Sequence, residues 1–118
     1  MDKENLKIIT SPGARDGQHI LELKGVLTIQ TVFGLQEAMQ RENALELIID
    51  MTRVQYMDSA GLGVLVASYV RAKKTSRKLA FAGMNARVKA LTDMSNLSQF
   101  LDIYPTVKDA EAALSKAL

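Results

Sequence analysis

The group with the clearest chemical potential in this sequence is the hydroxyl of Ser59, within the stretch Asp58–Gly63. A serine hydroxyl can cap a helix, act as a nucleophile beside a base, or accept a phosphoryl group. The stretch follows an apolar run and precedes a helical pattern, and the carboxyl ends of strands often carry function in open α/β sheets. Ser59 is therefore the main functional candidate, and helix capping is the structural alternative.

Catalysis by Ser59 is not expected. The single histidine, His19, lies in a predicted strand far along the chain from Ser59, and no Gly-x-Ser-x-Gly elbow surrounds Ser59. The sequence has no cysteine, Walker loop or metal-ligand cluster. We therefore predict no enzyme activity, no catalytic residue, no cofactor and no metal.

Length and composition indicate one globular domain over residues 1–118, with its core at about 6–114. The chain has 118 residues, of which 47% are apolar and 24% charged. These are ordinary values for a domain with a single core. We find no signal peptide and no apolar run of the roughly 20 residues that a membrane-spanning helix needs. A cytoplasmic location without membrane insertion is the default expectation.

The charge pattern does not favour nucleic-acid binding. The formal net charge is only +2, and the one basic cluster lies between Arg71 and Lys78. Such a cluster is more often the solvated carboxyl end of a helix, where cations suit the helix dipole. We expect no direct contact with nucleic acid.

Alternating patterns predict an α/β fold with a mixed, mostly parallel sheet of four to five strands and about four helices. The first two strands are joined by a loop and are expected to pair antiparallel. In the last helix, Thr106 suits the N-cap and Asp109 a capping box, with Ala110, Ala113, Leu114 and Ala117 on the apolar face. The predicted strands are 6–10, 19–24 with 26–27 after Gly25, 45–49, 78–82 and 101–104, and the predicted helices are 31–41, 59–74, 85–94 and one opening at 105–109.

The helix predicted at 59–74 has two apolar faces. The face expected to meet the core comprises Leu62, Leu65, Val66 and Tyr69. The second face consists of small or apolar residues, namely Ala60, Gly61, Gly63, Val64 and Ala67. Glycine in a helix costs about 1 kcal/mol relative to alanine, so the two glycines suggest that another backbone comes close. That backbone could belong to this fold or to a partner protein, and both alternatives stay open.

Phosphorylation of Ser59 would change this surface strongly. It adds about −1.5 to −2 charge, which a helix N-terminus tolerates. A partner packed over a small apolar face would have to desolvate that charge. A loss of 2–3 kcal/mol would weaken binding roughly 30- to 150-fold.

The chain resembles STAS domains, the fold shared by bacterial anti-sigma factor antagonists and the cytosolic tails of sulphate transporters. The segments that carry the resemblance are Leu23–Leu27, Leu47–Asp50 and Met57–Leu65. The Asp-Ser-x-Gly-Leu-Gly motif after an apolar strand is its most specific part. The similarity extends from about Leu6 to Leu114.

The resemblance implies that Ser59 is the phosphoacceptor of an anti-sigma factor antagonist. In such proteins the anti-sigma factor is a serine kinase that uses ATP and magnesium, and a serine phosphatase resets the switch. The unphosphorylated antagonist binds the anti-sigma factor and releases the sigma factor. Thr28 stands where many members carry an aspartate. The residues expected to bind the partner are Thr28, Asp58, Ser59, Ala60, Gly61, Gly63, Val64 and Ala67.

A second function class stays open, namely a STAS scaffold or transport-complex subunit that does not switch. Such a protein would bind its partners whatever the charge at Ser59. Homodimer formation is a further open alternative.

Overall fold

Five strands and four helices alternate in the computed structural model, which describes residues 5–115. The strands lie in one mixed sheet of order β1-β2-β3-β4-β5, in which only β1 and β2 pair antiparallel. This confirms the predicted fold class. The elements are β1 Leu6–Pro12, β2 Gln18–Leu27, α1 Val32–Arg41, β3 Glu46–Met57, α2 Ser59–Lys74, β4 Lys78–Ala82, α3 Ala86–Met94, β5 Ile103–Tyr104 and α4 Val107–Ser115.

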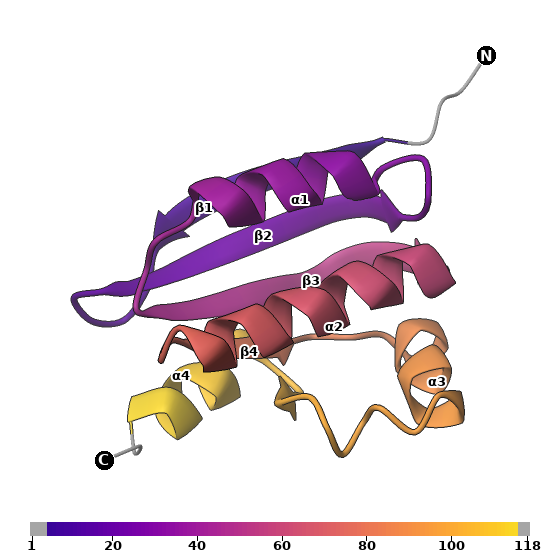
Figure 1. Ribbon diagram of the computed structural model, residues 1–118. Helices are drawn as coiled ribbons and strands as arrows, with labels where there is room; N and C mark the ends of the chain where they lie inside the picture. The colour runs from indigo at the N-terminus through magenta and orange to yellow at the C-terminus, as the bar shows by residue number, and fades with distance from the viewer. Residues whose placement is uncertain (1–4, 116–118) are drawn as a thin grey trace.

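The helices form two layers around the sheet. Figure 1 shows α1 and α2 lying side by side over one face, with α3 below the amino-terminal end of α2 in this view. The main core fills this side and includes Leu35 from α1, Leu65 from α2 and Val88 from α3. On the other face, Ala110 and Leu114 of α4 pack with Ile48 and two alanines of β4. The predicted core face of α2 is confirmed, since Leu62, Leu65 and Tyr69 are buried and Val66 is half-buried.

Strand β3 is much longer than predicted. The apolar run ends at Ile49, but the strand continues to Met57. Its second half pairs with the end of β2, with Val54 opposite Gly25 and Met57 opposite Leu27. Only Val54 and Met57 are buried there after Met51, so no simple alternation marks this part as a strand. The extension places Ser59 at the far carboxyl end of the central strand.

Gly25 does not interrupt the second strand as predicted. Its φ is +126°, and β2 continues through it with a register shift against β3. A Cβ atom at this position would lie 2.3 Å from the carbonyl oxygen of Asn5. Glycine is therefore needed because the backbone just before β1 lies directly beside the strand at this position.

Thr106 caps the last helix as predicted, because its Oγ1 accepts a hydrogen bond from the Asp109 N–H at 3.0 Å. Within residues 5–115, the Asp109 carboxylate has no hydrogen-bond partner, so the reciprocal half of the predicted capping box is wrong. Ala110 and Leu114 are buried and Ala113 is half-buried, in agreement with the predicted apolar face. Ala117 lies outside the described residues.

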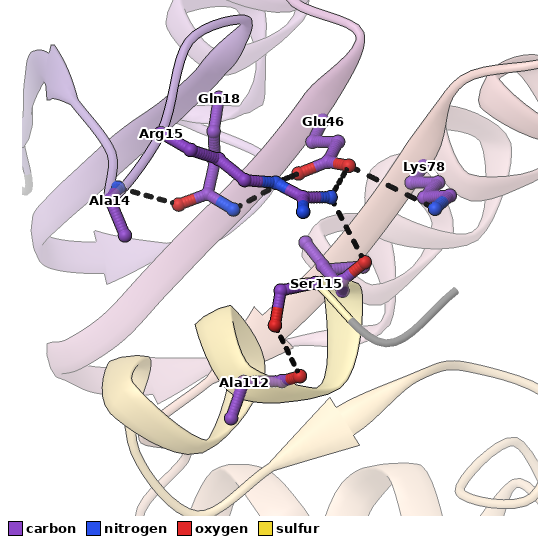
Figure 2. A network of polar contacts seen from close by, with 8 residues as sticks. Ala14, Arg15, Gln18, Glu46, Lys78, Ala112 and Ser115 are labelled. Carbon is purple, nitrogen blue, oxygen red and sulfur yellow. Dashed lines mark hydrogen bonds and ion pairs between the residues drawn. The ribbon is translucent and has the colours of Figure 1, made fainter. Parts of the chain in front are cut away.

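A polar network at the amino end of β3 fastens three distant segments (Figure 2). The carboxylate of Glu46 accepts hydrogen bonds from Arg15 and from Gln18 Nε2, the latter at 3.0 Å, and pairs with Lys78 at 3.8 Å. Arg15 also donates to the carbonyl of Leu114 at 3.1 Å. The hydrogen bond from Arg15 holds the pKa of Glu46 below its ordinary value. The network thus joins the β1–β2 loop and α4 to the central strands.

Candidate functional site

Asp58, and not Ser59, caps helix α2. Its backbone is extended, with φ −103° and ψ −176°, and its Oδ1 accepts a hydrogen bond from the Gly61 N–H at 3.0 Å. The other carboxylate oxygen, Oδ2, accepts the Ile29 N–H at 3.1 Å. The capping alternative for Ser59 is therefore wrong, because the preceding side chain already satisfies the first turn. Asp58 also ties the β2–α1 loop to the start of α2.

Ser59 is the first residue of α2 and is exposed to solvent. The helix start was predicted at this residue and is confirmed. Among the described residues, nothing forms a hydrogen bond with its hydroxyl. A serine at the first helical position with no bonded side chain contributes little to the fold. Its hydroxyl is consequently free to meet another molecule.

The two glycines of α2 have different surroundings. A Cβ at Gly61 would lie 2.4 Å from the carbonyl oxygen of Leu27 and 2.9 Å from Cγ of Met57. A Cβ at Gly63 would meet no atom within 4 Å. The close backbone approach that the sequence indicated is therefore internal at Gly61. At Gly63 the fold itself imposes no such need, and the exposed surface there stays open to a partner.

Thr28 lies in the β2–α1 loop and is buried, with 4% of its surface exposed. Its carbonyl accepts the backbone N–H groups of Thr31 and Val32, and its own N–H donates to Thr31 Oγ1 at 2.9 Å. Its Oγ1 accepts the Gln30 N–H at 3.3 Å. Thr28 therefore shapes the loop from within. Because Thr28 is buried, it can affect the binding of a partner only by positioning the exposed residues of this loop.

That loop and the first turn of α1 present two large apolar side chains that the sequence reasoning missed. Ile29 is 63% exposed and Phe33 is 72% exposed. Phe33 falls outside the apolar face of α1 that Val32 and Leu35 define, and this mismatch was the available signal. Because Asp58 bonds the Ile29 N–H, the loop lies against the start of α2.

We use the name docking surface for the residues that α1, its preceding loop and α2 expose around Ser59. Of the eight predicted partner-binding residues, Thr28 and Gly61 are buried, Asp58, Ala60 and Val64 are half-buried, and Ser59, Gly63 and Ala67 are exposed. The structure brings the residues of the second face of α2 together and adds two from the α1 side. The docking surface comprises Ile29, Phe33, Ser59, Ala60, Gly63, Val64 and Ala67.

A catalytic partnership between Ser59 and His19 is excluded by geometry. His19 pairs in register with Leu47, near the amino end of β3, whereas Ser59 follows Met57 at the other end. The intervening strand spans about 30 Å at roughly 3.3 Å per residue. His19 instead forms a 2.6 Å hydrogen bond with Glu42.

Neither a metal centre nor a membrane span is found in residues 5–115. No group of three or more histidine, cysteine or acidic side chains is placed to hold a metal ion. No helix in this range has the length and apolarity to cross a membrane.

The basic cluster ends α2 as expected. Arg71, Lys73 and Lys74 occupy its last turn. Arg77 instead donates to the carbonyls of Ala44 and Glu42, at 2.9 and 2.8 Å. The cluster is thus partly structural.

Comparison with known proteins identifies the family. The model of the STAS domain matches residues 8–110. The chain is 32% identical over 93 residues to the anti-sigma-B factor antagonist of Listeria monocytogenes, covering 75% of this chain and 82% of that protein. It is 33% identical over 70 residues to the anti-sigma F factor antagonist of Paenibacillus polymyxa, covering 59% of this chain and 60% of that protein. The crystal structure of an anti-sigma factor antagonist from Mycobacterium paratuberculosis superposes with a TM-score of 0.84 at 21% identity, over 94% of this chain and 95% of that one. The chain belongs to the STAS domain family.

Proposed function

We propose that this protein is an anti-sigma factor antagonist whose binding is controlled by phosphorylation of Ser59. In its unphosphorylated form it binds an anti-sigma factor serine kinase through the docking surface and thereby releases a sigma factor. The observation that carries the proposal is the free, exposed hydroxyl of Ser59 within that surface, at the first residue of α2. The names of the curated relatives support the same function class.

The folded domain can accept a phosphoryl group on Ser59. The capping bonds of α2 belong to Asp58, so modification of the neighbouring hydroxyl breaks no hydrogen bond within the described residues. The new charge would sit at the positive end of the helix dipole, which is a favourable place for an anion. The Asp58 carboxylate beside it is a like charge, so part of that benefit is lost. The folded state should therefore persist, and the main effect falls on binding.

The docking surface is poorly suited to a partner once it carries a phosphoryl group. Ile29 and Phe33 offer exposed apolar area, and the open position at Gly63 lets another backbone approach α2. An interface of this kind excludes water, so a dianion within it would have to be desolvated. One hydroxyl can thus switch the interface without remodelling the domain.

Phosphate mapping is the direct test of this proposal. The protein is incubated with ATP, magnesium and the anti-sigma factor kinase encoded in the same genome, and the modified residue is located by mass spectrometry. We expect phosphate on Ser59 and none in the Ser59→Ala variant. Ser11→Ala, which removes another exposed serine on edge strand β1, should be phosphorylated like wild type.

Phosphate on another residue, or equal labelling of Ser59→Ala, would contradict the proposal. A protein that is never phosphorylated and binds its partner equally well with an acid at position 59 would instead be the non-switching scaffold.

A further inference from the structure

A groove lies between α1 and α2, lined in part by Val64 and Ala67 of the docking surface but not by Ser59. Its volume is about 330 Å³, and its floor includes Leu47 of β3 and Leu79 of β4. Met39 lines one wall from α1, and Val64 and Ala67 line the other from α2. Small-molecule sites commonly have volumes of roughly 300–1,000 Å³ and mostly apolar linings with a few polar groups. The groove is therefore large enough for a small ligand.

The groove is also lined by the neutral polar residues Gln36, Gln40 and Ser68, and its charged groups are all basic. Arg71, Arg77 and Lys78 line it, and no aspartate or glutamate does so. Lys78 shares Glu46 with Arg15, at 3.8 Å from the carboxylate. Within residues 5–115, no carboxylate lies within ion-pair distance of Arg71 or Arg77. The groove thus holds two arginines whose charges are not neutralised by an ion pair.

Arg77 is held in place by the backbone. Its Nε donates to the carbonyl of Ala44 at 2.9 Å, and its Nη2 donates to the carbonyl of Glu42 at 2.8 Å. These bonds orient the guanidinium but leave its full charge in place. A guanidinium has five N–H donors, so others remain available to an anion.

The groove is apolar at one end of α2 and basic at the other. Val64 and Ala67 lie toward the start of the helix, and Arg71 lies two turns after Val64. At 1.5 Å per residue, this separation is about 10 Å along the helix. An apolar body lying beside Val64 and Ala67 would therefore bring a head group at its end to the arginines.

We propose that this groove binds a small amphipathic anion, with a carboxylate or phosphate head at Arg71 and Arg77 and a short aliphatic body over Leu47, Leu79 and Val64. The shared chemistry is one anionic head on an apolar chain. The proposal does not depend on the antagonist function, because the ligand needs neither Ser59 nor a partner protein.

Titration of the isotope-labelled full chain with octanoate tests the proposal by NMR. We expect saturable shifts at groove residues with a dissociation constant of about 1 mM or tighter. Octyl phosphate in a parallel titration shows which head group is preferred, and saturable binding of either one supports the proposal. Octanol and octylammonium should bind at least about tenfold more weakly, because they lack the anionic head. Equal binding of octanol, or no saturable shifts with either anion at about ten times that concentration, would overturn it.

A matched pair of variants locates the head group. Arg71 and Lys74 are both exposed cations in the last turn of α2, but only Arg71 lines the groove. Arg71→Ala should weaken octanoate binding by about tenfold, and Lys74→Ala by less than about twofold. Equal losses in the two variants would show a diffuse charge effect and would contradict a defined site.

Discussion

The polar side chains at the two ends of β3 differ in how far they are hydrogen-bonded within the domain. At the amino end, the Glu46 carboxylate bonds with Arg15 and Gln18 and pairs with Lys78. At the carboxyl end, both carboxylate oxygens of Asp58 accept backbone N–H groups, one as the cap of α2 and one from the β2–α1 loop. The neighbouring Ser59 hydroxyl has no partner among the described residues. The first end fastens the β1–β2 loop and α4, and the second presents exposed Ile29 and Phe33. The hydroxyl to which we assign the function is thus one that the described part of the fold does not use.

The largest effect on stability is expected from the two glycines of α2. Gly61→Ala should lower the free energy of unfolding by about 3 kcal/mol, because the new methyl would overlap the Leu27 carbonyl. Gly63→Ala should raise it by up to about 1 kcal/mol, since the position is open and alanine favours a helix. Urea unfolding of both variants measures the difference. Equal effects would show that Gly61 is not the internal contact.

Phe33→Ala should have the next largest effect, on binding and not on stability. Loss of this side chain, which is 72% exposed, should weaken binding of the anti-sigma factor by about 2 kcal/mol, or roughly 30-fold. Met94→Ala is the control, because Met94 is 81% exposed on α3. Isothermal titration calorimetry measures both affinities. If Met94→Ala weakened binding and Phe33→Ala did not, the docking surface would be placed wrongly.

Alanine substitutions of the neighbours Asp58 and Ser59 should differ in their effect on stability. Asp58→Ala should lower the free energy of unfolding by about 1–2 kcal/mol, because the Gly61 and Ile29 N–H groups lose their acceptor. Ser59→Ala should change it by less than about 0.5 kcal/mol. Thermal and urea unfolding provide the comparison. A large loss in Ser59→Ala would mean that the fold does use this hydroxyl.

Glu46→Gln tests the polar network at the amino end of β3. It should lower the free energy of unfolding by about 1 kcal/mol at neutral pH. The pKa of Glu46 is lowered in the folded state, mainly by the hydrogen bond from Arg15. Its contribution is therefore present above the ordinary value of 4.5 and is lost as the pH falls through the lower folded pKa. Wild type should lose this part of its stability in acid, and Glu46→Gln should lack that part of the pH dependence. Glu37→Gln, on the exposed side of α1, should retain the wild-type pH profile.

Much of the fold followed from local patterns, because its helices bury one clear face. The bounds of α2 were predicted to the residue, since apolar spacing and the Asp-Ser start agree. The second half of β3 could not be predicted, because Thr52–Met57 is a strand only by virtue of pairing with β2. Strand pairing over this distance leaves no local pattern.

At the candidate site, the sequence placed Asp58 and Ser59 at the start of α2 but did not decide which of them caps the helix. Asp58 and Ser59 are both good caps, and only the extended backbone of Asp58 decides between them. Gly61 and Gly63 look alike in sequence, and only the atoms of Leu27 and Met57 packed against Gly61 distinguish them. Phe33 lies outside the buried face of α1, so apolar helical spacing does not single it out.

The most direct test of the central claim is the affinity of Ser59→Asp for the anti-sigma factor, measured by calorimetry beside wild type and Ser11→Asp. The account predicts that Ser59→Asp binds roughly 30- to 150-fold more weakly, with unchanged unfolding, and that Ser11→Asp binds like wild type. Equal affinities of Ser59→Asp and wild type would contradict it.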